Sequence, residues 1–232
     1  MKKLASVLII IVIVVLLGLW SPWRGISIDI GSIFGINQQE SLSGLQIYSL
    51  SGTLQIFVDN ELKGEVTPET SPNFIDKINP GEHLIRLERK SDIPNSYWNL
   101  NKLVNFEKGT NVVISYNIGT EEVFSEGQII YATKKTDPSK SSQLRVNLSV
   151  NGFSTQLDTL PLESVALNEY TTNLDLSRQH TIKLAKNGYE SSDFTVLPST
   201  QEDRDKLKDY DLTIEAQLMF QPVNVEDITT SS

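Results

Sequence analysis

The sequence predicts an all-β protein in which two tandem small antiparallel β-sandwich domains follow a single N-terminal transmembrane helix. Three features carry this prediction: an uncharged apolar run near the N-terminus, an alternation of apolar and polar residues beyond residue 44, and a strand pattern that occurs twice. The chain has 232 residues. That length is enough for an anchor and for either one sizeable domain or two small ones.

The N-terminal segment begins with Lys2 and Lys3 and continues as an apolar run from Leu4 to Trp20. As a helix, this run would reach about 26 Å, the short end of what crosses the hydrocarbon core of a bilayer. The lysines place the N-terminus in the cytoplasm and the bulk of the chain outside it. We therefore expect a single-pass anchor over 1–24 that contacts the lipid bilayer of the cell membrane.

A cleaved secretory signal peptide is the alternative reading of this segment. Cleavage needs small residues after the apolar core, whereas this core ends Gly18-Leu19-Trp20-Ser21-Pro22-Trp23. Trp20 and Trp23 instead suit the membrane interface, where an apolar ring and a polar N–H are both satisfied. We favour the uncleaved anchor, followed by a linker over 25–43.

Composition excludes several classes of partner and site. The formal net charge is -9, and an acidic exterior argues against nucleic acid, which needs a basic stripe to displace counterions. It also argues against flat docking on anionic lipid. The chain contains no cysteine, so disulfides, lipoprotein processing and thiolate metal sites are all excluded.

Short alternating segments bounded by turn residues predict the strands. In chain order they are 45–48, 54–58, 74–78, 83–87, 100–106, 111–118, 127–131, 144–150, 180–184 and 212–218. Alternation with one polar face is typical of half-buried antiparallel strands. Short strands at this spacing favour sandwiches over βαβ units.

The strand pattern occurs twice along the chain. Gly44–Tyr48 is similar to Gly127–Tyr131, and each opens a series of strands, while His83–Leu87 matches His180–Leu184. A repeated unit of this length predicts two tandem copies. The predicted segments beyond the linker are a first domain over 44–120, a second over 125–222 and a flexible tail over 223–232.

The turn motifs of the first copy carry a family resemblance. The first copy resembles a PEGA domain in the order of its motifs, which are Val58-Asp59-Asn60, Thr67-Pro68 and Pro80-Gly81. One residue is added before Thr67-Pro68. Asn60 replaces the usual glycine, and Tyr97-Trp98 replaces the usual Gly-Tyr. PEGA domains are small β-domains of bacterial and archaeal surface proteins. The resemblance therefore implies a non-catalytic module.

The second copy resembles the family less closely. Val150-Asn151-Gly152 takes the place of Val58-Asp59-Asn60, and Thr159-Leu160-Pro161 takes the place of Thr67-Pro68. Gly188-Tyr189 matches the usual Gly-Tyr.

Two groups of residues invite a catalytic or metal-binding reading. His83 and His180 are the two histidines, but each begins a strand on its apolar face, and no nucleophile or second ligand stands near either. The aspartates of 203–211 lack the glycine and glutamate of a calcium loop. We interpret the histidines as structural and the aspartates as part of a solvated loop or a helical turn capped by Thr200. No catalytic site, metal site or cofactor is predicted.

Tyr97 and Trp98 form the candidate recognition loop. Both side chains present rigid area, and loops of sandwiches commonly carry binding. The alternative, which we favour, is a core plug between the sheets.

These expectations combine into a functional hypothesis. The sequence predicts a non-enzymatic protein that binds or spaces an envelope protein or polysaccharide outside the membrane. There are two alternatives. One is an enzyme or accessory subunit that acts on envelope polysaccharide, and the other is a passive structural stalk.

Overall fold

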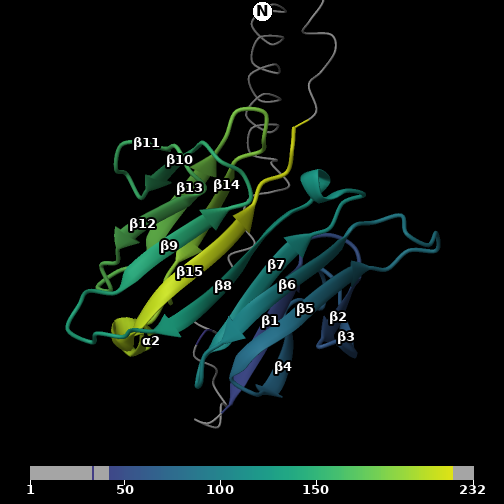
Figure 1. Cartoon of the computed structure of the whole chain (residues 1–232), viewed down its shortest axis with the longest axis horizontal. Helices are drawn as coiled ribbons and strands as arrows, with labels where there is room; N and C mark the ends of the chain where they lie inside the picture. The colour runs from purple at the N-terminus through teal and green to yellow at the C-terminus, as the bar shows by residue number, and fades with distance from the viewer. Residues whose placement is uncertain (1–32, 34–41, 222–232) are drawn as a thin grey trace, which may run out of the picture.

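The computed structural model describes residue 33 and residues 42–221. The predicted anchor over 1–24, most of the linker and the tail over 223–232 lie outside the described residues. Within the described part of the chain, no helix has the length and apolar character that a membrane crossing requires. The described part of the chain consists mainly of strands, which are arranged in three sheets (Figure 1), so the predicted all-β class is confirmed.

The first repeat contains seven strands. They are β1 (Ser43–Ser49), β2 (Leu54–Val58), β3 (Glu61–Val66), β4 (Asn73–Ile78), β5 (Gly81–Arg89), β6 (Asn99–Phe106) and β7 (Asn111–Asn117). A small sheet of order β3-β2-β5-β6 forms one layer, and β4, β1 and β7 belong to the other. Most neighbours are antiparallel, as expected, but β1 and β7 are parallel.

The second repeat has the same topology. After η2 (Glu122–Phe124) and β8 (Glu126–Lys134), its strands are β9 (Gln143–Leu148), β10 (Phe153–Leu157), β11 (Glu163–Val165), β12 (Glu169–Asn173), β13 (His180–Ala185), β14 (Ser192–Val196) and β15 (Tyr210–Gln217). The helix α2 (Gln201–Lys206) and the turn η3 (Leu207–Asp209) precede β15. The small sheet has the order β11-β10-β13-β14, and β9 pairs parallel with β15 as β1 does with β7.

Strand pairing corrects the predicted match between the repeats. In the first repeat, β1 pairs with β4 and β7. In the second repeat, β9 pairs with the corresponding strands β12 and β15. The counterpart of β1 is therefore β9 and not β8. The match of Gly127–Tyr131 to Gly44–Tyr48 was therefore wrong. Both segments are apolar strands that begin with glycine, and pairing partners cannot be read from such a pattern alone.

The same correction applies to one turn of the second copy. The counterpart of Asp59, which follows β2, is Asp158, which follows β10. Val150-Asn151-Gly152 instead lies in the preceding turn, between β9 and β10. In the first copy, Asp59 and Asn60 form a two-residue turn with φ values of 50° and 67°. Asn60 can replace glycine there because asparagine tolerates the left-handed region.

A single large sheet joins the repeats. Its order is β12-β9-β15-β8-β7-β1-β4, and the antiparallel pairing of β7 with β8 connects the two halves. The predicted boundary between 120 and 125 falls in the loop of this hairpin. The two sandwiches are therefore continuous through one layer instead of being joined by a free linker.

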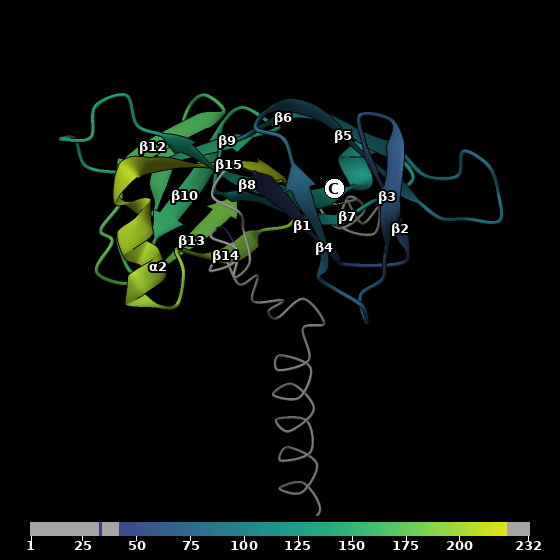
Figure 2. The same ribbon diagram turned by 90° about the horizontal axis from the view of Figure 1, so that it is seen from below.

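The two small sheets cover opposite faces of the large sheet, as Figure 2 shows. Val112, Ile114 and Ile129 point into the core of the first repeat. Their neighbours Val113 and Ile130 point the other way, into the core of the second repeat. Each small sheet covers one half of the large sheet. Among residue 33 and residues 42–221, no sheet therefore covers the face of β15, β9 and β12 opposite the second core.

Candidate binding groove

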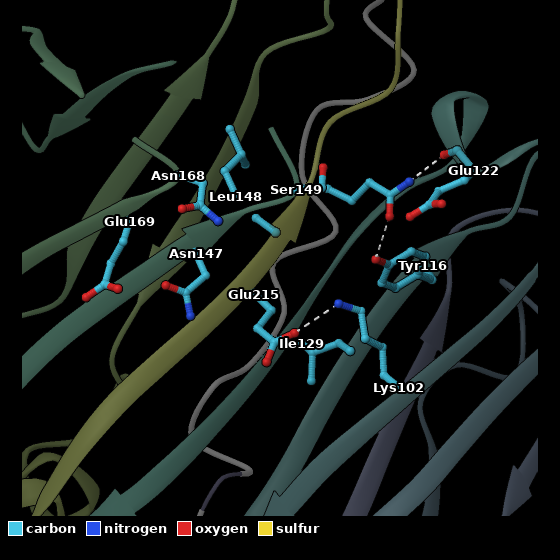
Figure 3. A pocket seen from close by; sticks show the side chains of 12 residues that line it. Lys102, Tyr116, Glu122, Ile129, Asn147, Leu148, Ser149, Asn168, Glu169 and Glu215 are labelled. Atoms are coloured by element: carbon cyan, nitrogen blue, oxygen red, sulfur yellow. Dashed lines mark hydrogen bonds and ion pairs between the residues drawn. The ribbon is translucent and has the colours of Figure 1, made fainter. Parts of the chain in front are cut away.

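A groove lies where this uncovered face meets the edge of the first small sheet (Figure 3). Its volume is about 450 Å³. Lys102 reaches it from β6, Tyr116 from β7 and Glu215 from β15, while Asn147 comes from β9. Both repeats thus contribute to one concave surface, which we call the groove.

An ion pair closes one side of the groove. Lys102 lies opposite Ile85 of β5, so it points to the inner side of the first small sheet. There its Nζ lies 3.3 Å from Glu215 Oε2, across the junction between the repeats. The hydroxyl of Tyr131 donates to the other carboxylate oxygen of Glu215, at 3.2 Å. Burial, together with the charge of Glu215, raises the pKa of Tyr131 to about 12.

A second chain of hydrogen bonds supports the part of the groove that β7 and η2 form (Figure 3). The Tyr116 hydroxyl donates to Gln217 Oε1 at 3.3 Å, and Gln217 Nε2 donates to the backbone carbonyl of Glu122. This chain connects β7, β15 and η2. Burial raises the pKa of Tyr116 well above its ordinary value, and the charges of Glu215 and Glu122 add to the effect. Tyr116 is therefore a neutral, fixed part of the groove wall.

Other polar groups of the groove remain available to a ligand. Within residues 42–221, no hydrogen-bond partner is found for the side-chain amides of Asn147 and Asn168 or for the hydroxyl of Ser149. Asn147 is half-buried, and the other two are exposed. Glu169, beside Asn168, forms a 3.3 Å ion pair with Arg145, and both side chains are largely exposed. The groove thus combines fixed walls with unpaired donors and acceptors.

The described residues form no evident metal centre. Across residue 33 and residues 42–221, no three His, Asp or Glu side chains converge so as to hold a metal ion. The arrangement of the groove is suited to binding a polar ligand through hydrogen bonds. Its polar groups come from the five strands β6, β7, β9, β12 and β15, from η2, and from the turns after β9 and before β12. The shape of the groove therefore depends on the packing of both repeats.

Tyr97 and Trp98 are not among the residues that line the groove, and they pack against the first core. Both side chains are half-buried there. The Arg89 guanidinium lies 4.5 Å from the centre of the Tyr97 ring, and the Trp98 backbone N–H donates to the Gly119 carbonyl at 3.0 Å. The exposed apolar side chain of the same loop is Ile93. Trp20 and Trp23, predicted at the membrane interface, lie outside the described residues.

Each histidine belongs to a structural pair with an aspartate. His83 Nδ1 lies 2.6 Å from Asp59 Oδ2, and His180 Nδ1 lies 2.8 Å from Asp158 Oδ2. In both repeats the second aspartate oxygen accepts the backbone N–H of the residue after the histidine. The two pairs belong to different repeats. Each ties the end of one strand to the start of another.

The aspartate-rich segment forms the capped helix that was one of its two predicted structures. Thr200 is the N-cap of α2, and its side chain accepts the backbone N–H of Asp203. Lys206 and Lys208 form ion pairs with Asp203 and Asp205. The carboxylates of Asp203 and Asp205 are thus used in local ion pairs and in the capped turn, while Asp211 Oδ1 accepts the backbone N–H of Gln143.

Sequence reasoning missed the groove because its two walls are far apart in the chain. The alternation in 144–150 and 212–218 does place Asn147, Glu215 and Gln217 on a polar face. What it cannot show is that Lys102, from β6 of the other repeat, stands opposite that face. A period-two pattern shows only which residues share a face.

Comparisons with known proteins leave the family of the chain open. No protein-family model matches it, and no curated protein does. Among solved structures, a mutant of the shaft pilin SpaA from Lactobacillus rhamnosus GG matches 80% of this chain and 100% of that chain, with 7% identity and a TM-score of 0.22. A mutant of the major pilin from Streptococcus pyogenes matches the same shares, with 10% identity and a TM-score of 0.19. At these TM-scores, neither likeness says what this chain binds or does.

Proposed function

We propose that the protein is a non-catalytic binding module of the cell envelope, tethered by its N-terminal segment, and that the groove between its repeats holds the partner. The observation that carries the proposal is the contrast between the fixed walls of the groove and its unpaired polar side chains. Its walls are fixed by the Lys102–Glu215 ion pair and the Tyr116–Gln217 hydrogen bond. The side-chain amides of Asn147 and Asn168 form no hydrogen bond with any residue of 42–221. A preorganised frame with free polar groups is what a specific polar site needs.

The proposed location rests on the sequence. The apolar run from Leu4 to Trp20 after two lysines supports a tether with the β-domains outside the cytoplasm. A cysteine-free, acidic chain is compatible with that exterior. The resemblance of the first copy to PEGA domains supports a module that binds instead of catalysing.

An envelope sedimentation assay with groove variants tests this proposal. The full chain in detergent would be mixed with fragments of the native envelope, and the bound fraction would be measured after centrifugation. We expect Asn147→Ala with Asn168→Ala to remove about 1–3 kcal/mol of binding free energy, because each lost hydrogen bond contributes about 0.5–1.5 kcal/mol. That loss is about 5- to 150-fold in affinity.

The matched control is Asn105→Ala, which removes an exposed amide from β6 at a position outside the groove lining. It should leave sedimentation unchanged. The parent protein, the double variant and the control would be compared. If all three sediment equally, or if none sediments, a binding role for the groove is contradicted and a passive stalk is favoured.

A further inference from the structure

We propose that the ligand of the groove is a short glycan segment that carries a free amino group. This inference rests on the proposed function, since it names the ligand class for the same groove. Three properties of the groove support it: its volume, its supply of hydrogen-bonding groups and its charge.

The volume and chemistry of the groove fit a hydroxyl-rich ligand. A volume of about 450 Å³ lies in the range of small-molecule sites. A side-chain amide offers two donors and two acceptor positions, and a serine hydroxyl offers both roles. Neighbouring sugar hydroxyls also donate and accept, so Asn147, Asn168 and Ser149 can each pair with more than one of them. Ile129 contributes an apolar wall, but polar side chains dominate the lining.

The charge of the groove favours a ligand with a positive group. Of its three carboxylates, Glu215 is paired with Lys102 and Glu169 with Arg145. In the described part of the chain, no cationic side chain lies within ion-pair distance of Glu122. A ligand with an ammonium group would complement this carboxylate. A bare metal ion would not suit it, because three acidic ligands do not converge there.

A basic peptide is the competing occupant with the same charge. Extended peptides are held mainly by backbone pairing with a sheet edge and by apolar pockets for alternate side chains. The free groups of the groove are instead side-chain amides and a hydroxyl, which favours the glycan.

Titration calorimetry of the full chain in detergent tests the ligand class. The probes are a glucosamine tetramer, the same tetramer N-acetylated on every sugar, and trilysine. We expect the glucosamine tetramer to bind roughly two- to fivefold more tightly than its N-acetylated form, which is the usual scale of one exposed ion pair. Added salt should reduce this preference, since it screens the charge.

Two variants assign the binding to named groups. Glu122→Gln should remove the preference for the free amine, while Asn147→Ala with Asn168→Ala should weaken both tetramers. The matched control Glu163→Gln, on exposed β11, should change neither. Circular dichroism and a thermal melt of each variant would show that its fold is retained.

The inference is overturned if the two tetramers bind equally, if trilysine binds more tightly than either, or if no glycan binds. These outcomes are separable from failure of the proposed function. If the groove variant still loses envelope sedimentation while no glycan binds, the ligand class is wrong and the binding role stands.

Discussion

Asp158 accepts a hydrogen bond from His180 in the second repeat at the position where Asp59 contacts His83 in the first, and the second pair is the less exposed of the two. The His180 and Asp158 side chains are 3% and 15% exposed, whereas those of His83 and Asp59 are 17% and 56% exposed. The same contact thus occurs in two solvent environments within one chain. The pairs also differ in Arg178, whose guanidinium nitrogen lies 2.8 Å from Asp158 Oδ2.

We predict that Asp158→Asn destabilises the protein more than Asp59→Asn does. A hydrogen bond to a charged group in a buried site contributes about 1.5–3 kcal/mol, while an exposed ion pair contributes about 0–1 kcal/mol. Urea denaturation of the two variants measures the difference in unfolding free energy. Equal losses would show that neither burial nor the Arg178 ion pair makes the second pair more stabilising.

The same pairs predict a loss of stability in acid. The hydrogen bond from His83 lowers the pKa of Asp59. Burial alone would raise the pKa of Asp158, but the hydrogen bonds from His180 and the Thr181 N–H outweigh burial and lower it. A carboxyl with a lowered pKa stabilises the fold above its unfolded pKa of about 3.9, and this stabilisation is lost as the pH falls. The drop in melting temperature below about pH 4 should be smaller in Asp158→Asn than in the parent protein.

A separate prediction concerns alkaline pH. Because the pKa of Tyr131 is raised to about 12 in the fold, the folded protein favours the neutral phenol. This contribution to stability is complete below the unfolded pKa of about 10 and is lost as the pH rises toward 12. We expect Tyr131→Phe to flatten the decline of melting temperature above about pH 10. A decline as steep as that of the parent protein would exclude Tyr131 as a contributor.

We also predict that the two repeats unfold together. Ile85 and Ile182 are fully buried in the first and second cores, respectively. Each change to alanine should cost about 2–5 kcal/mol. Because the large sheet is continuous through β7 and β8, both variants should lower the temperature of one shared calorimetric transition. Two transitions, each moved by only one variant, would show that the halves melt independently.

Trp98→Ala distinguishes the two roles considered for Tyr97 and Trp98. Since Trp98 is packed against the first core, its truncation should lower the unfolding free energy by about 0.5–3 kcal/mol. Envelope sedimentation should fall only in proportion to the unfolded fraction. An unchanged melt with lost sedimentation would instead identify a recognition element.

The sequence could predict the elements of this fold better than their assembly. Alternation located β2 and β15 within a few residues, because half-buried strands have a period of two. It could not identify β8 as the strand between the repeats, since a strand that is buried on both faces has no polar face to mark its neighbours. For the same reason the parallel pairing of β1 with β7 was not predicted.

The candidate site was less accessible to prediction than the fold. Asn147 and Glu215 lie on strands whose polar faces were visible in the sequence, but their proximity to Lys102 depends on which face of the large sheet each small sheet covers. Tyr97 and Trp98 stood out by residue type and loop position. Their packing against the first core is a tertiary property, which residue type alone does not determine.

The continuous sheet also determines how the molecule would respond to mechanical tension. β1 and β7 are parallel, and β8 is antiparallel to both β7 and β15, so β1 and β15 run in the same direction. Tension between the start of β1 and the end of β15 would therefore act along the strands. Backbone hydrogen bonds lie across the strands, so such a load would shear several ladders at once instead of opening them one bond at a time. A module pulled from these two points would yield abruptly and only at high load.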